Sequence, residues 1–243
     1  MSYPQNQNNS LSATEIMLQE LNHEIDLLLY AISHDLRAPL RSIDGFTEAL
    51  VEDYGDVLDD MGKDFLHRIK NAGKLLNRYI ESALDVSRQT RGEILSESVD
   101  LTLIAHEILS NFQLSQPRTI KLIIQDNLIV HGDKKLLTTL LEKLLHNAWK
   151  FTSKSDNPEI EFSFYEEHNH QIFFVRDNGV GFDMDYASRR LFGLFQRMHS
   201  ETEFEGMGTG LASARRIINR LGGRIWAEAK VNQGATFFFT LKL

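Results

Sequence analysis

The sequence predicts an α+β chain with two parts, an N-terminal helical hairpin and a C-terminal α/β sandwich. Up to about residue 92, apolar residues recur every three or four positions, which is the spacing of one helix face. After residue 98, short apolar runs alternate with helical segments, which indicates a mixed sheet with helices packed on one face. With 243 residues, the chain is long enough to bury a core in a domain of this kind.

The composition narrows the class of protein. Hydrophobic residues make up 42% and charged residues 25%, which is typical of a globular chain. The net charge of −8 argues against a nucleic-acid partner, because phosphate binding needs clustered Lys and Arg. The chain has no cysteine, which excludes disulfides and thiolate metal sites and fits the cytoplasmic location that we expect. The longest apolar run of the first helix, residues 27–32, is too short for a transmembrane segment.

The first 92 residues predict a polar tail and a helical hairpin. Residues 1–10, MSYPQNQNNS, have no apolar period and are predicted to be disordered. Residues 11–92 carry two apolar stripes, separated by the acidic turn EDYGDVLDDMG. The stripes are Leu18, Leu21, Ile25, Leu28 and Ile32 in the first helix, and Phe65, Ile69, Ala72, Leu76, Ile80 and Leu84 in the second. Two helices alone bury little, so we expect a homodimer that closes a four-helix bundle.

The remaining residues predict a linker, 93–98, and a second domain, 99–243. Asp100 and Asp133 are placed to cap two helices, the second of which extends to about residue 152. The segment TIKLIIQDNLIV is interpreted as one strand, and EIEFSFYEE, HNH and QIFFVRDNG as a hairpin. A glycine-rich stretch leads into the helix TGLASARRIINRL, and GRIWAEA and ATFFFTLKL are the final strands on either side of the turn VNQG.

The segment AISHDLRAPLRSIDGF raises the first candidate site. His34 lies two residues from both Ile32 and Leu36, so it is predicted to point away from the apolar face, toward solvent. Asp35 could accept a hydrogen bond from one ring nitrogen, which would fix the tautomer and leave the other nitrogen free to attack. Pro39 removes the helical partner of the Asp35 carbonyl and predicts a bend just past the histidine. The alternative is an exposed histidine and a tolerated kink without a role.

Three further segments suggest a nucleotide site. Lys143, Asn147 and Lys150 recur at i, i+4 and i+7 and form a polar stripe on a leucine-rich helix. In RDNGVGFD, Asp177 ends an apolar strand, and its carboxylate could accept a hydrogen bond from the amino group of adenine. Guanine presents an oxygen at that position and would be repelled. Gly179 and Gly181 follow Asp177 and let the backbone pass close to a flat base. Taken singly, the stripe could be a solvated face and the DNG sequence an ordinary turn.

The stretch GMGTGL places Gly206, Gly208 and Gly210 directly before a helix, and backbone N–H groups at such a position bind phosphate. It matches neither a Walker A motif nor a Rossmann fingerprint. Taken alone it could be a flexible loop. The preceding segment LFGLFQRMHSETEFE, apolar and then polar, predicts a mobile lid over a ligand.

Together, these segments resemble the bacterial two-component sensor histidine kinases. In order along the chain, SHDLRAPL looks like the H box of that family, LLHNAWKFT its N box, DNGVGF its G1 box, LFGLFQRMH its F box and GMGTGL its G2 box. The resemblance covers residues 11–243, and its wording is most similar to the phytochrome-like branch. It implies a dimeric phosphotransfer hairpin and an ATP-binding domain of the type shared with gyrase, Hsp90 and MutL.

The resemblance also implies a role for each matched residue. His34 would accept the γ-phosphoryl group of ATP, with Asp35 as its acid–base partner, and pass it to an aspartate on the receiver domain of a response regulator. Asn147 would hold Mg²⁺, and Asp177 would bind adenine. The other implied nucleotide contacts are Lys150, Gly179, Gly181, Phe192, Phe195, Arg197, Gly206, Gly208, Gly210 and Thr236.

Two positions depart from the family pattern. Ala38 stands where the family usually has Thr or Asn, which disfavours phosphatase activity toward the regulator. Lys143 stands where the family usually has Asn and the related ATPases have a catalytic Glu. A lysine cannot act as the carboxylate base that activates water, but it could crowd the metal or bond phosphate directly. The alternative functions are an ATP-binding pseudokinase scaffold, which Lys143 suggests, and a gyrase-type ATPase, which the H box and the missing Glu disfavour.

Overall fold

The computed structural model describes residues 13–88, 93–200 and 202–242. The predicted tail, residues 1–10, lies outside this part of the chain. The chain divides into two compact units, residues 1–87 and residues 88–243. Among the described residues, no helix has the length and apolar character that crossing a membrane requires.

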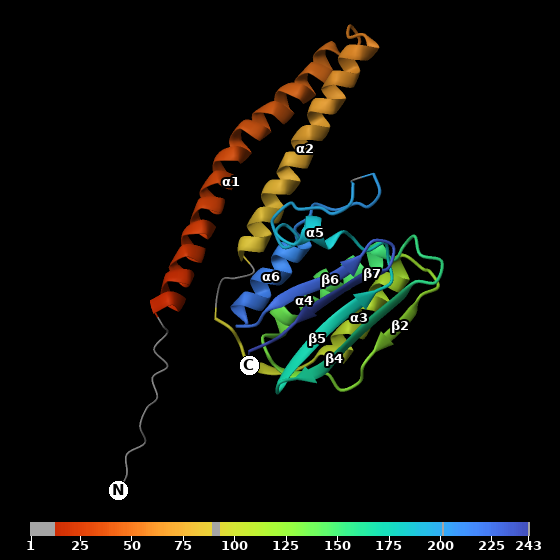
Figure 1. Ribbon diagram of the computed structural model, residues 1–243. Helices are drawn as coiled ribbons and strands as arrows, with labels where there is room; N and C mark the ends of the chain where they lie inside the picture. The colour runs from red at the N-terminus through yellow and green to blue at the C-terminus, as the bar shows by residue number, and fades with distance from the viewer. Residues whose placement is uncertain (1–12, 89–92, 201, 243) are drawn as a thin grey trace. The chain divides into compact units, whose positions relative to one another are not determined.

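The first unit contains two long helices, α1 (Ala13–Tyr54) and α2 (Asp60–Arg88) (Figure 1). Pro39 lies inside α1, and the helix continues beyond it to Tyr54, as the helical spacing of the apolar residues predicts. A buried cluster of Leu40, Ile80 and Leu84 joins the two helices. An ion pair between the Lys70 Nζ and Glu48 Oε1 atoms, 3.1 Å apart, adds a second contact.

Most of the predicted apolar stripes stay exposed in the single hairpin. In the described part of the two stripes, the second helix buries Ile80 and Leu84, whereas Phe65, Ile69 and Leu76 are at least 41% exposed. In α1, Ile25, Leu28 and Ile32 are likewise more than 40% exposed. The side chains of Leu18 and Leu21 lie outside the described residues. The hairpin therefore presents a long apolar surface to solvent, which is unfavourable unless another surface covers it.

The second unit contains a five-stranded sheet with the strand order β2-β4-β5-β7-β6. β2 runs parallel to β4, and the other neighbours are antiparallel. A separate pair, β1 with β3, is antiparallel. The strands are β1 (Glu97–Asp100), β2 (Lys121–Ile124), β3 (Ile129–Gly132), β4 (Glu159–Glu167), β5 (His170–Asp177), β6 (Ile225–Lys230) and β7 (Gly234–Phe239).

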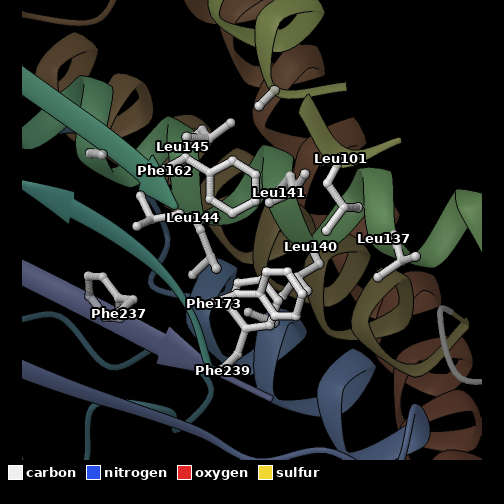
Figure 2. Packing of buried hydrophobic residues seen from close by; sticks show 14 of the residues in the cluster. Leu101, Leu137, Leu140, Leu141, Leu144, Leu145, Phe162, Phe173, Phe237 and Phe239 are labelled. Carbon is white, nitrogen blue, oxygen red and sulfur yellow. The ribbon is translucent and has the colours of Figure 1, made fainter. Parts of the chain in front are cut away.

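Helices cover one face of this sheet (Figure 1), and one further helix is a single short turn. They are α3 (Leu101–Ser115), α4 (Lys134–Phe151) and α6 (Gly210–Arg220), with α5 (Met184–Ala187) as the short one. The core lies between α4 and the sheet, where Leu140, Leu141 and Leu144 face Phe162 and Phe239 (Figure 2). All five side chains are fully buried. This confirms the predicted α/β sandwich.

Two helix starts and one turn follow the sequence closely. The Asp100 and Asp133 carboxylates accept hydrogen bonds from the Leu103 and Leu136 N–H groups, at 3.1 and 3.0 Å, as predicted for capping residues. Between β4 and β5, His168 and Asn169 both have positive φ, which suits a two-residue hairpin turn.

The predicted single strand TIKLIIQDNLIV is wrong. The structure divides it into β2 and β3, because Asn127 adopts a left-handed conformation with φ of 59° and turns the chain. β3 then pairs with β1, whose first two residues belong to the predicted linker 93–98. Apolar spacing alone could not show this division, since both halves of the segment look like strand.

Replacing Leu141 by alanine should destabilise the second unit by about 2–5 kcal/mol, since it leaves a cavity in a core that cannot fully collapse. The measurement is urea unfolding, followed by the fluorescence of the two tryptophans, Trp149 and Trp226, which both lie in this unit. The control is Leu103→Ala, since Leu103 is 67% exposed. Equal effects of the two substitutions would contradict the assignment of this core.

Candidate functional site

One face of α4 lines a cavity of about 220 Å³, here called the α4 cavity. Lys143, Asn147 and Lys150 all contribute to its wall. The i, i+4, i+7 spacing places them on one side of the helix, while the leucines at 140, 141 and 144 point into the core. The polar stripe predicted from sequence is therefore one wall of a cavity.

The glycine-rich loop 206–210 forms the opposite wall of the α4 cavity. A Cβ atom on Gly206 would lie 3.3 Å from the Lys150 Nζ atom, and one on Gly210 would lie 4.0 Å from the amide atoms of Asn147. Gly208 has a φ of 70°, and a side chain there would collide with the Gln196 carbonyl oxygen. The loop therefore lies directly against the polar stripe, and it needs glycine to do so.

The first turn of α6 adds hydrogen-bond donors to this wall. Thr209 is the N-cap residue, and its side chain makes no capping hydrogen bond. Thr209, Gly210 and Leu211 all line the α4 cavity. Backbone N–H groups at an uncapped helix start, with the positive end of the helix dipole, favour an anion.

The charges around the α4 cavity are mainly positive. Lys143, Lys150 and Arg197 line it, and Glu205 is the carboxylate among the described lining residues. Burial, and then the charge of Arg197, lower the pKa of Lys150. Partial burial, followed by the charges of Lys150 and Lys143, lowers the pKa of His146, which also lines the cavity. This arrangement is suited to a group with several negative charges.

Asp177 lies at the end of β5, on the helix-covered side of the sheet together with Phe173 and Val175. The whole Asp177 residue is 4% exposed. Its Oδ1 atom accepts a hydrogen bond from the Gly179 N–H at 2.9 Å. Burial raises the pKa of Asp177 to about 6, although hydrogen bonds from the Gly179 and Ala235 N–H groups act in the opposite direction. A buried carboxylate of this kind can recognise a hydrogen-bond donor.

The adenine contact expected of Asp177, together with this raised pKa, predicts that nucleotide binding weakens in acid. The ionised carboxylate is the better acceptor for an amino group, and Asp177 becomes protonated as the pH falls through about 6. Below that value, the dissociation constant should rise up to about tenfold per pH unit, because one proton competes with the ligand. The measurement is ATP titration between about pH 5 and about pH 8. ATP itself also titrates in this range, so the same titration of an Asp177→Asn variant serves as the control. If the dissociation constants of the two proteins change in parallel with pH, the prediction is contradicted.

The predicted lid, LFGLFQRMHSETEFE, is attached to α4 by aromatic contacts. The rings of Phe151, His199 and Phe204 lie 5.1–5.4 Å apart between centroids. The Arg197 Nη2 atom donates a hydrogen bond to the Phe204 carbonyl oxygen at 2.7 Å. Burial, as the largest influence, lowers the pKa of His199, while a hydrogen bond with the Gly181 backbone acts against this. The lid therefore closes over the end of α4 through His199 and Phe204.

The structure brings some predicted site residues together and separates others. Asn147, Lys150, Arg197, Gly206, Gly208 and Gly210 line the α4 cavity, whereas Asp177, Gly179, Gly181, Phe192, Phe195 and Thr236 do not. Phe192 packs against the core, and Phe195 is 39% exposed with a φ of 60°. Gly179 lies against the Phe151 carbonyl, which places Asp177 near the C-terminal end of α4.

The side chains of Thr236 and Asp177 point to opposite faces of the sheet, although both residues line a second pocket. Thr236 pairs with Arg176, and its side chain points to the sheet face that carries Phe174 and Phe238, opposite to the helices. The residue opposite Asp177 in the register is Ala235. Residue order alone could not separate these neighbours, because adjacent residues in a strand point to opposite faces. The geometry therefore gives no support to Thr236 as a base contact.

His34 is the candidate site of the first unit. Its side chain is 75% exposed, and the Nδ1 atom lies 3.2 Å from the Asp35 Oδ1 atom, whose side chain is 82% exposed. The predicted solvent exposure and hydrogen bond are thus confirmed. Since Nδ1 is engaged with the carboxylate, Nε2 is the nitrogen available for attack.

Sequence reasoning missed several residues of the α4 cavity. His146, His199 and Phe204 line it, and although they lie inside the quoted N box, F box and lid segment, the sequence analysis gave none of them a role. Phe204 could have been noticed as an isolated aromatic residue in the polar run HSETEFE. Among the described residues, no group of three or more His, Cys, Asp or Glu side chains could hold a metal ion.

Two family models match the chain. Residues 24–92 match the model described as the His Kinase A (phospho-acceptor) domain. Residues 132–243 match the model described as the Histidine kinase-, DNA gyrase B-, and HSP90-like ATPase. The first match includes His34, and the second includes every residue named above on the wall of the α4 cavity.

The chain is also similar in sequence to individual proteins. The chain is 33% identical to Cyanobacterial phytochrome B of Nostoc sp., over 96% of this chain and 31% of that protein. It is 36% identical to the Methanogenesis regulatory histidine kinase FilI of Methanothrix harundinacea, over 90% of this chain and 25% of that protein. The chain thus spans about a third or less of these relatives.

Solved structures share the fold at lower sequence identity. The full-length ShkA structure in complex with AMPPNP has a TM-score of 0.58 at 22% identity, covering 88% of this chain and 45% of that chain. The Acinetobacter baumannii histidine kinase AdeS has a TM-score of 0.54 at 20% identity, covering 86% of this chain and 97% of that chain.

Proposed function

Since the chain belongs to the sensor histidine kinases, with phytochrome-like proteins among its relatives, we propose that it transfers the γ-phosphoryl group of ATP to His34 and then to an aspartate on a response regulator. The observation that carries this proposal is the pairing of two sites in one chain. One is an exposed imidazole with a carboxylate partner, and the other is a positively charged cavity lined by a glycine-rich loop.

The second unit would bind ATP along the polar face of α4, between this face and the glycine-rich loop. The Asp177 carboxylate would accept a hydrogen bond from the amino group of adenine. Guanine would be disfavoured, because it presents an oxygen in place of that amino group. The phosphates would extend along α4, where Lys150, the N–H groups of the glycine-rich loop and the start of α6 supply positive charge. The volume of about 220 Å³ is below the roughly 300–1,000 Å³ typical of small-molecule sites, and Asp177 does not line this cavity, so ATP would extend beyond it.

The residues of the α4 cavity fit a magnesium ion that accompanies ATP. Asn147 offers an amide oxygen beside Gly210, and the described part of the chain has no cluster of carboxylates and histidines that would bind a metal by itself. Mg²⁺ in phosphate sites is usually held by one or two protein oxygens, the phosphates and water. When bound, Mg²⁺ would supply charge neutralisation between the phosphates.

His34 would act as the nucleophile. With Nδ1–H donating to Asp35, the Nε2 lone pair attacks the γ-phosphorus, and the bond between that phosphorus and the bridging oxygen of ADP breaks. The phosphorylated ring then carries a positive charge, which the Asp35 carboxylate stabilises or removes by taking the Nδ1 proton. Transfer to a carboxylate of the regulator follows by displacement at the same phosphorus atom.

The exposed apolar face of the hairpin supports a homodimer. Ile25, Leu28, Ile32, Phe65 and Leu76 are all at least 41% exposed in the single chain. Pairing two hairpins would bury these stripes in a four-helix bundle, at roughly 25 cal/mol for each Å² of apolar surface removed from water. The match to the phospho-acceptor domain model agrees with this interpretation.

The proposal is tested by incubating the full chain with γ-labelled ATP and Mg²⁺. A phosphohistidine is stable in base and labile in acid, so label with that behaviour supports the kinase, and its transfer to an isolated receiver domain supports the complete reaction. Nucleotide binding without label would support a scaffold instead. Release of phosphate without label on the protein would support an ATPase.

A further inference from the structure

We propose that Lys143 recognises the terminal phosphate, so that the site prefers a nucleoside triphosphate to a diphosphate through a protein side chain. This inference rests on the proposed function, and it assigns a position where the histidine kinase resemblance and the chain disagree.

The order of residues along α4 gives the direction of the bound nucleotide. Asp177 and Gly179, the base end, lie by the Phe151 carbonyl at the C-terminal end of α4. Moving toward the N-terminus, Lys150 faces Gly206, and Asn147 then faces Gly210. Lys143 is four residues beyond Asn147, a rise of about 6 Å along the helix. Lys143 is therefore at the end of the α4 cavity farthest from the base.

Lys143 and Lys150 bring positive charge to the α4 cavity, where Glu205 is the carboxylate among the described lining residues. Burial, and then the charges of Lys150 and Lys143, lower the pKa of His146, so Lys143 lies near that ring. None of the ion pairs found between described residues involves Lys143 or Lys150. An anion bound in the α4 cavity would be attracted to both lysines, because both line this one small cavity.

The chemistry of a lysine suits a phosphate that is held rather than hydrolysed. Its ammonium group donates up to three hydrogen bonds and accepts none, so it neutralises phosphate oxygens but cannot remove a proton from water. A carboxylate at this position could activate water against the terminal phosphate. Lys143 would thus hold the γ-phosphate for an incoming imidazole and give no assistance to hydrolysis.

The test compares the affinities of the full chain and its variants for ATP and for ADP by isothermal titration, with Mg²⁺ and with a metal chelator. In Lys143→Ala, the dissociation constant for ATP should rise about tenfold while that for ADP changes by less than about twofold, the size expected for one charge-assisted hydrogen bond. Lys143→Arg should keep most of the preference for ATP. The matched control is Lys135→Ala, an exposed lysine on the same helix outside the α4 cavity.

Each outcome decides the proposal. A loss of ATP affinity that is confined to the triphosphate, and that is larger in chelator than in Mg²⁺, supports it. Equal weakening for ATP and ADP indicates a structural or general electrostatic role and overturns it, as does unchanged affinity for both. If the unaltered chain binds neither nucleotide, the proposed function itself fails, so the two failures are distinguishable.

Discussion

Replacing His34 by glutamine should reduce phosphorylation of the chain to less than about 1% of the unaltered level, because glutamine has no nitrogen nucleophile. ATP affinity should stay the same, since His34 lies in residues 1–87 and the nucleotide residues lie in 88–243. His34 is 75% exposed, so the fold should tolerate the substitution. The measurement is acid-labile label from γ-labelled ATP, together with an ATP titration.

The matched control for this variant is His67→Gln, because His67 is an exposed histidine on the other helix of the same hairpin. It should keep full labelling. Label that persists in His34→Gln, or that disappears equally in His67→Gln, would show that another residue accepts the phosphoryl group. Loss of ATP binding in His34→Gln would also contradict the separation of the two sites.

Replacing Asp177 by asparagine should weaken ATP binding by about 30- to 100-fold, the size expected when a hydrogen bond to a charged group is lost. The Gly179 N–H should hold the new amide oxygen where it now holds the carboxylate, so the amide NH₂ group would face the base. That group repels the amino group of adenine but can donate to the oxygen of guanine. Affinity for GTP should therefore rise as affinity for ATP falls.

The stability of Asp177→Asn distinguishes recognition from folding. Burial raises the pKa of Asp177 to about 6, so the ionised carboxylate costs the folded state free energy at neutral pH. The neutral amide removes that cost, and thermal unfolding at pH 7 should show a fold that is no less stable. The control is Asp126→Asn, at an exposed turn outside the α4 cavity. Equal losses for ATP and GTP would contradict the assigned role.

The sequence predicted those parts of the fold that depend on local interactions. The caps Asp100 and Asp133, the β4–β5 hairpin and the leucine-rich face of α4 each follow from neighbouring residues, through side-chain hydrogen bonds or apolar spacing. The solvent exposure of His34 and its contact with Asp35 are local in the same sense, because both residues lie on one helix turn.

The tertiary structure decided what depends on residues far apart in the chain. The turn at Asn127 separated one expected strand into β2 and β3, and pairing of β1 with β3 absorbed part of the expected linker. Lid contacts made by His199 and Phe204 with Phe151 depend on side chains about fifty residues apart that meet only after folding.

The functional site likewise combines features that the sequence predicted with features that only the tertiary structure decided. The order of the motifs and the resemblance to histidine kinases predicted His34, Asn147 and Lys150 as residues for phosphoryl transfer, and the structure places Asn147 and Lys150 on the wall of one cavity. The face of β7 on which Thr236 lies, and the place of Lys143 at the far end of the α4 cavity, follow from strand register and from the packing of the glycine-rich loop on α4. Side-chain chemistry is a property of single residues, whereas direction and proximity arise only when the strands and helices pack together.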